Sequence, residues 1–493
     1  MNIKAKASVA ATALLMVLFV IDSNVRGQEP TSSPSQSVSK PATDKAKSEE
    51  PNDVAATTNA AKTEAGKPAQ TAEAVSKPVQ APAAAAKPAA APEPDFWRRE
   101  EMTGDWGGTR TKWKEKGFEM EISLTQFYQG VASGGIRTSS EYNGTFQTLF
   151  KVDFGKMFGW KFWSAEIKTE TRFGGPLVGG TGSINPVNTS AIIPGADGTV
   201  FSVTVVNITK LFPINLQEGK LIALSFGRYN LVDLLDEDFF AGGGTDRFFN
   251  IAQIGPLTVL RQVPLITNAV NFAYIRGGEP FITLGLLDPN DHSVDPGLDD
   301  LYADGVTFAP GINFPVKYFG KSAKHTIGGA ITTKKYTPFD VIRQIIIPGP
   351  AINPITPQRG SWSINYTFRQ YLVERGKGDG WGFFSQVSFA DKDTSPITNF
   401  FNVGLGGNGL FKSRRGDEFG LSYAYTDLSE VLKDNIDLLR LGERLRPEHQ
   451  VELFYNVHIT PWLQLTGDLQ VLRPSRPIAD TAIVPGVRLK MIF

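Results

Sequence analysis

The feature that most constrains this chain is a two-residue alternation of apolar and polar side chains. Successive side chains of a β-strand point to opposite faces, so this period predicts strands with one apolar and one polar face. The stretch SWSINYTFRQYL shows it well, because Trp362, Ile364, Tyr366 and Phe368 alternate with Ser361, Ser363, Asn365, Thr367 and Arg369. The pattern recurs, with some slips, in EMEISLT, TFQTLFKVDF, FWSAEIKTETRF, EFGLSYAYT, VELFYNVHIT and LQLTGDLQVL.

Two architectures share this signature. A secreted β-sandwich binding protein would bury its apolar faces between two sheets, whereas a transmembrane barrel would turn them toward lipid. Three observations favour the barrel: segments of about ten residues, aromatic residues near segment ends, and full charges on the polar faces. The aromatic residues are Phe158, Trp160, Phe162, Trp163, Tyr423, Tyr425 and Trp462. The sequence therefore predicts an all-β, antiparallel transmembrane barrel, with the sandwich as the alternative.

The spacing of the segments predicts about 16 strands. Links such as GKMFGW and TPW are short, whereas 174–198, 230–250, 288–300 and 338–358 are long and rich in Gly, Pro or Asp. Short periplasmic turns and long external loops are typical of bacterial barrels. An even number of strands would place both ends of the barrel on the periplasmic side.

The chain divides into three parts. Residues 1–27 are typical of a secretory signal peptide, with Lys4 and Lys6 before an apolar run from Val9 to Ile21. Residues 28–95 hold 18 Ala, 10 Pro and 7 Lys but no Leu, Ile, Phe, Tyr or Trp. We expect a disordered periplasmic linker there, because no large apolar group offsets the ordering entropy. Residues 96–493 form the predicted barrel.

Charge and residue usage exclude several classes of function. Residues 96–493 carry 40 basic and 40 acidic residues, which argues against a nucleic-acid partner and against an anion pore. The chain has no Cys and only four His, none spaced as a metal pair, so we expect no metal and no cofactor. The sequence has no G-x-S-x-G motif and no other set of residues typical of a catalytic site, so we expect no enzymatic activity.

Four blocks of sequence between 96 and 493 form a characteristic series. The first is the box GDWGGTR, which contains Gly104, Asp105, Trp106, Gly107, Gly108 and Arg110. It is followed, in order, by FGRYNLVDLLDEDFFAGGGTDRFFN, GDGWGFFSQVSFADKD and GLFKSRRGDEFGLSYAYTDLS. These blocks resemble the OprB-type carbohydrate-selective porins, over nearly all of 96–493. The resemblance implies passive diffusion of small carbohydrates through a pore in the outer membrane of a Gram-negative cell. A general diffusion porin and an anion or other solute porin are the alternatives.

Two groups of charged residues are candidates for the pore lining. Loop 226–250 is the first candidate for a constriction, with Arg228, Asp233, Asp236, Glu237 and Asp238. Its alternative is an external loop that carries solvated acids. On the predicted wall, Glu166, Lys168, Glu170 and Arg172 should face the lumen, where they contact either solute or one another. In the GDWGGTR box we expect structural roles, with Trp106 as an interfacial anchor and Asp105 paired with Arg110.

The last ten residues, VPGVRLKMIF, predict the closing strand of the barrel. Val487, Leu489, Met491 and Phe493 should face lipid, and Arg488 and Lys490 should face water inside. Pairing of this strand with the first would remove the open edge of the sheet. Phe493 also resembles the terminal aromatic residue that the outer-membrane assembly machinery reads. The expected partners are therefore outer-membrane lipid, small carbohydrates and this machinery. The expected assembly is a monomer or a homotrimer.

Overall fold

The computed structural model describes residues 95–177, 179–195, 198–235, 242–341, 356–438 and 444–493. The predicted signal peptide, 1–27, lies outside these residues. The predicted linker, 28–95, lies outside them as well, except for Asp95.

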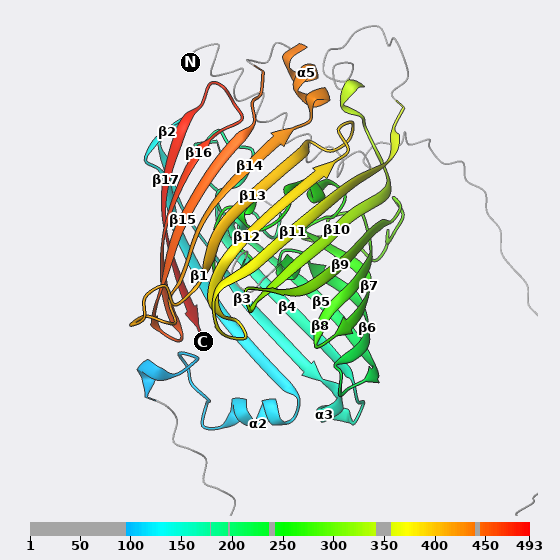
Figure 1. Ribbon diagram of the computed structural model, residues 1–493, viewed down its shortest axis with the longest axis vertical. Coiled ribbons are helices and arrows are strands. Elements are labelled where there is room, and N and C mark those ends of the chain that lie inside the picture. The colour runs from blue at the N-terminus through cyan, green and yellow to red at the C-terminus, as the bar shows by residue number, and fades with distance from the viewer. Residues whose placement is uncertain (1–94, 178, 196–197, 236–241, 342–355, 439–443) are drawn as a thin grey trace, which may run out of the picture. The chain divides into compact units, whose positions relative to one another are not determined.

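The described strands form one antiparallel sheet that closes on itself (Figure 1). The strands are β1 (Phe118–Val131), β2 (Ser133–Gly135), β3 (Ser139–Asp153), β4 (Trp163–Gly174), β5 (Val200–Asn215), β6 (Lys220–Asn230), β7 (Ile266–Arg276), β8 (Glu279–Leu287), β9 (Thr307–Tyr318), β10 (Lys321–Tyr336), β11 (Gln358–Gly376), β12 (Asp379–Ala390), β13 (Ile397–Asn408), β14 (Glu418–Leu428), β15 (Glu448–Thr460), β16 (Leu463–Arg473) and β17 (Asp480–Ile492).

The ring closes because β1 pairs with both β3 and β17. In the closing pair, Thr125 lies opposite Lys490 and Phe127 lies opposite Arg488. The three-residue β2 continues the path of β1 and pairs with β17 near Ile483. Counted around the barrel there are sixteen strands, so the predicted architecture and approximate strand number are confirmed.

The links between strands differ at the two ends of the barrel. The end that carries both barrel termini, here called the short-turn rim, has links of two to nine residues; the shorter ones are 216–219, 277–278, 319–320, 377–378 and 461–462. The other end, here called the loop rim, carries the longer links 175–199, 231–265, 288–306 and 337–357. The predicted long loops therefore all lie at one rim, as far as the structure describes them.

Helices are short and lie in the links or before β1. They are η2 (Phe96–Arg98), α2 (Thr109–Glu115), α3 (Phe154–Phe158), η3 (Thr189–Ala191), η4 (Asp233–Leu235), η5 (Ile251–Gln253), η6 (Leu257–Arg261), η7 (Phe339–Val341) and α5 (Glu430–Leu438). Among the described residues, no helix is long and apolar enough to cross a bilayer.

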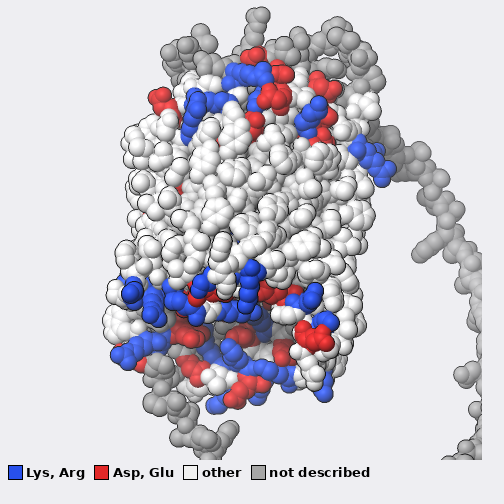
Figure 2. All heavy atoms as spheres, viewed as in Figure 1, with Lys and Arg blue, Asp and Glu red and all other residues white. Residues whose placement is uncertain are grey.

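The apolar faces of the strands point outward. On β11, Trp362 and Ile364 are 47% and 49% exposed, whereas Ser361 and Ser363 are 4% and 5% exposed. Figure 2 shows an uncharged belt across the strands, between two bands of charged residues. A soluble sandwich buries these side chains instead. The alternation was therefore assigned to the correct faces, and the β-sandwich alternative is wrong.

The GDWGGTR box lies at the short-turn rim, next to the end of β17. The Arg110 guanidinium donates to the main-chain carbonyl of Phe493 at 2.6 Å, and it lies 4.6 Å from the Trp106 ring. The expected pair between Asp105 and Arg110 is wrong. The Asp105 carboxylate instead accepts hydrogen bonds from Thr111 N (2.7 Å) and Oγ1 (2.9 Å) at the start of α2, which leaves Arg110 to pair with Glu101 at 3.4 Å.

The balanced charge of the barrel separates between the two rims. The exposed charged residues of the rims lie in the links, in 95–117 and in the three residues at either end of each strand. The short-turn rim carries four acids and thirteen cations, Arg98, Lys112, Lys114, Lys116, Lys156, Lys161, Arg276, Lys317, Arg375, Lys377, Lys412, Arg414 and Arg415. The described loop rim carries eleven acids and six cations, Arg137, Lys335, Arg359, Lys392, Arg444 and Arg473.

Candidate functional site

A polar network crosses the inner wall at β4. Lys168 Nζ lies 2.9 Å from Glu170 Oε1 on its own strand and 2.9 Å from each carboxylate oxygen of Asp233 in η4. Glu170 is held from the other side, because Thr204 and Asn230 donate to the same oxygen at 2.9 and 3.1 Å. Wall strand and loop are therefore joined by one lysine between two carboxylates.

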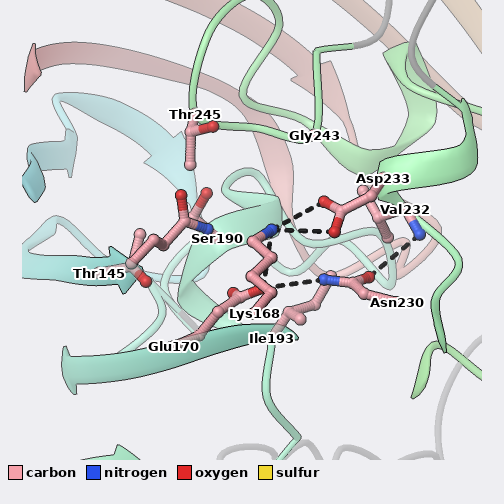
Figure 3. A pocket seen from close by; sticks show the side chains of 11 residues that line it. Thr145, Lys168, Glu170, Ser190, Ile193, Asn230, Val232, Asp233, Gly243 and Thr245 are labelled. Atoms are coloured by element: carbon pink, nitrogen blue, oxygen red, sulfur yellow. Dashed lines mark hydrogen bonds and ion pairs between the residues drawn. The ribbon is translucent and has the colours of Figure 1, made fainter. Parts of the chain in front are cut away.

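This network lines a small polar cavity (Figure 3). Two buried hydroxyl groups at the cavity, Thr145 Oγ1 and Ser190 Oγ, have no hydrogen-bond partner among the described residues. Such groups cost free energy when they stay unpaired, and they are available to a polar guest. The complete lining is Thr145, Gln147, Lys168, Glu170, Ser190, Ile193, Asn230, Val232, Asp233, Gly243 and Thr245, without an aromatic ring.

The described parts of two loop-rim links fold into the barrel rather than away from it. These are the β4–β5 loop (175–199) and the β6–β7 loop (231–265), which meet where Thr189 N and Oγ1 both donate to the Phe249 carbonyl at 2.8 Å. Gly244 lies at this crossing with φ of +79°, and a Cβ there would come 2.9 Å from the Thr189 Cβ. Glycine is thus required for both its conformation and its size.

Wall carboxylates on β15 hold both loops by their main chains. Glu448 accepts from Ile184 N at 2.7 Å and from Ser183 Oγ at 2.8 Å. Glu452, fully buried, accepts from Phe249 N at 2.6 Å and from Asn250 N at 3.0 Å. Each carboxylate therefore satisfies loop N–H groups that would otherwise be buried without a partner.

Wall arginines hold the same loops by their carbonyl groups. Arg172 donates to Ala191 O at 3.0 Å and to Pro194 O at 3.2 Å. Arg488 donates to Arg247 O at 2.9 Å, to Gly244 O at 3.2 Å and to Asp246 O. Lys490 forms an ion pair with the Asp246 side chain.

The expectation that Arg488 faces water inside is therefore wrong. The residue points inward, but it is only 1% exposed because the β6–β7 loop covers it. Its guanidinium lies 4.6 Å from the Phe249 ring of that loop. The sequence pattern gave the direction of the side chain, but it carried no sign that a loop occupies that part of the lumen.

The loops fill one side of the lumen with apolar side chains. Phe248 of the β6–β7 loop lies 4.9 Å from the Phe454 ring and 5.9 Å from the Phe384 ring, both on inner walls. A second cluster joins Ile251 and Leu257 to residues of β13, β14 and α5. We call the wall β11–β15 with these clusters the packed side, and the wall β3–β6 with the cavity the polar side.

The other predicted site residues take different positions. Glu166 lies on β4 and is half-buried. Arg228 lies at the loop-rim end of β6 and donates to Asp295 O of the β8–β9 loop at 2.5 Å, so it does not line the cavity. Asp236, Glu237 and Asp238 lie outside the described residues. Of the predicted residues that the structure describes, only Lys168, Glu170 and Asp233 come together at the cavity.

Sequence reasoning missed the β4–β5 loop, Thr145 and the two carboxylates of β15. Glu448, Gln450 and Glu452 share one face in the two-residue alternation, which could have marked β15 as a wall with unusual inward charge. Nothing in the sequence indicates that their partners are loop N–H groups. Among the described residues, no group of three or more His, Asp or Glu is arranged to hold a metal ion.

Comparison with known proteins identifies relatives of this chain among the porins. The family described as "Carbohydrate-selective porin, OprB family" matches residues 137–493. Porin B of Pseudomonas aeruginosa PAO1 is 23% identical over 434 residues, which cover 80% of this chain and 91% of the relative. The high-pH structure of Pseudomonas putida OprB has a TM-score of 0.69 at 20% identity, covers 81% of this chain and is itself covered fully. This structural likeness supports the barrel fold.

Proposed function

Since this chain belongs to the OprB family of carbohydrate-selective porins, we propose that small sugars cross its barrel along the polar side, past Lys168, Glu170 and Asp233. The protein is an outer-membrane channel for passive diffusion. The proposal concerns the route and the residues that a sugar contacts on that route.

One observation carries the proposal, namely the division of the lumen. On the packed side, buried apolar side chains from the two inserted loops, α5 and the wall form two clusters that fill the space between loop and wall. On the polar side, the cavity places a cation, two carboxylates and two unpaired hydroxyl groups next to one another. A route through the polar side needs no disruption of a packed core.

The chemistry of the cavity suits a neutral polyol. Each sugar hydroxyl can donate to a carboxylate of Glu170 or Asp233 and accept from Lys168 Nζ, with Thr145 and Ser190 able to do either. Contacts of this kind are individually weak once water is displaced, so a solute can both enter and leave. One lysine against two carboxylates gives no excess of positive charge, which disfavours the anion-porin alternative.

The orientation and the assembly signal belong to the same proposal. We place the short-turn rim at the periplasm, because short periplasmic turns are typical of bacterial barrels. Phe493 as an assembly signal stays a prediction. Phe493→Ala tests it well, because the main-chain bonds of residue 493 to Arg110 and Ile122 do not need the ring. Unchanged insertion into outer membranes would contradict the signal.

The route is tested by Asp233→Asn in liposomes that take up glucose or a size-matched anion. This change keeps the side-chain shape but removes a charged partner of Lys168, and we expect glucose entry to change by up to about tenfold. Asp340→Asn is the matched control, because Asp340 is an exposed acid of the same rim in η7, away from the cavity. If both variants and the wild type admit glucose equally, the proposed route is wrong.

A further inference from the structure

The basic short-turn rim has few internal partners for its charge. Three of its thirteen exposed cations have a carboxylate within salt-bridge distance: Lys114 with Glu119, Arg375 with Asp379, and Arg414 with Asp417. For the other ten, the described part of the chain provides no such carboxylate. Figure 2 shows a band of Lys and Arg side chains, with Asp and Glu among them, below the uncharged belt.

Exposed aromatic rings lie at the same rim, next to the cations in sequence. Phe319 is 100% exposed and follows Lys317 by two residues, and Phe411 is 55% exposed and precedes Lys412. Lys161 lies between Trp160, 61% exposed, and Phe162. Large rings beside long cationic side chains are typical of protein surfaces at the headgroup level of a bilayer.

The opposite rim provides an internal comparison. Among the described residues, its exposed acids outnumber its exposed cations by eleven to six, while the short-turn rim has thirteen exposed cations and four exposed acids. An anionic surface would therefore be attracted to one end of the barrel and repelled from the other. Lys and Arg also form charge-assisted hydrogen bonds with phosphate oxygens, which adds short-range recognition to the long-range attraction.

We propose that the short-turn rim is a docking surface for anionic phospholipid headgroups, which bind by their phosphate groups around its ring of cations and aromatic residues. The partner is the leaflet in contact with this rim. The proposal does not depend on the route of the sugar, because it concerns the outer edge of the barrel and not its lumen.

The test uses the full-length barrel in nanodiscs that contain phosphatidylcholine and phosphatidylglycerol, followed by release and native mass spectrometry of the retained lipid. We expect phosphatidylglycerol to be enriched about fivefold over its share in the disc, the ratio expected for roughly one cation near an anionic surface. High salt should reduce the enrichment, because it screens exposed charges. This salt test needs no variant, so it remains informative if a variant fails to fold.

Two variants with equal numbers of changes locate the effect. In the first, glutamine replaces six short-turn cations, namely Lys112, Lys116, Lys161, Lys317, Lys412 and Arg415. In the second, glutamine replaces all six exposed cations of the loop rim. We expect the first to lose the enrichment and the second to keep it.

Several results would overturn the proposal. Equal retention of the two lipids by the wild type, or full enrichment in the first variant, would remove its basis. Displacement of the lipid by inorganic phosphate at comparable concentration would indicate a site for the free anion instead of a lipid surface. Capture of the barrel by isolated cell-wall polymer, without lipid preference, would assign the rim to a different partner.

Discussion

The two sides of the lumen differ in what fills the space between wall and loop. On the packed side, Phe248, Phe384 and Phe454 meet in a core that resembles the interior of a soluble protein. On the polar side, Lys168, Glu170 and Asp233 surround a cavity whose hydroxyl groups have spare hydrogen-bonding capacity. One inserted loop, 231–265, contributes to both. The comparison shows that one segment can be anchored by apolar burial while it offers a polar edge to the pore.

The largest effect should come from a change on the packed side. Phe248→Ala empties the centre of a buried aromatic cluster and should destabilise the loop core by about 3–5 kcal/mol. We expect higher and noisier single-channel conductance, because the loop loses its apolar anchor. Phe319→Ala, at a fully exposed ring, is the control and should leave conductance unchanged. If the conductance and the noise of Phe248→Ala both equalled those of the wild type, the packed side would not be what holds the loop.

The next largest effect should come from Arg488→Gln. The shorter neutral side chain cannot reach all of the loop carbonyl groups, and each unsatisfied buried group costs about 1–3 kcal/mol. Conductance should rise, and Arg488→Lys should restore part of the wild-type value because it keeps a charged donor. Arg473→Gln on β16 is the matched control, since Arg473 is exposed. Equal conductance of all three variants would exclude Arg488 as a residue that positions the loop.

A smaller effect, confined to solute flux, is expected from Thr145→Val. The change removes an unpaired hydroxyl of the cavity and keeps the shape, so stability should stay the same or rise slightly. Glucose entry should change by about two- to fivefold if sugars use this hydroxyl, as a hydrogen bond of about 0.5–1 kcal/mol implies. Thr125→Val is the matched control, because Thr125 is also buried and unpaired but does not line the cavity. Identical flux in the two variants would count against the polar route.

The smallest effect should be a pH dependence of the stability of the β8–β9 loop. This loop contacts the polar side where Arg228 donates a hydrogen bond to the main-chain carbonyl of Asp295. His292 Nδ1 lies 2.8 Å from Asp295, and Nε2 lies 3.7 Å from Asp288. Its interaction with Asp288 raises the pKa of His292 above the ordinary 6.5, despite an opposing effect of burial. Protonated His292 therefore stabilises the folded β8–β9 loop fully below about pH 6.5, and this stabilisation is lost as pH rises through the raised pKa.

Hydrogen exchange of residues 288–306 measures this effect. After correction for the intrinsic rates, protection should fall from about pH 6 to about pH 8.5, and His292→Gln should flatten the profile. Residues of β12 and β13, on the packed side, should show no such change over this range. An equal fall on both sides would mean that the titration is not local to the polar side.

Sequence patterns predicted the strands of the barrel wall far better than the contacts of the loops inside the barrel. The alternation in β11 gives the outward Trp362 and the inward Ser363 directly, because side-chain direction in a strand depends only on position. The loop contacts follow no such rule. Glu452 binds the main-chain N–H groups of residues 249 and 250, and any residue type except proline offers that donor, so the partner leaves no mark on the sequence. The same limit explains the error at Arg488, whose partners are carbonyl groups.

The pairing of β17 with β1 has a consequence for the permeability barrier of the cell. The strand that closes the wall also carries Arg488 and Lys490, which bind the β6–β7 loop. A barrel in which β17 has not yet paired with β1 therefore has neither a complete wall nor a β6–β7 loop held in place. We therefore expect that barrels without this strand pairing both leak solutes and lose solute selectivity. A cell that removes incompletely closed barrels would thereby also remove the unselective ones.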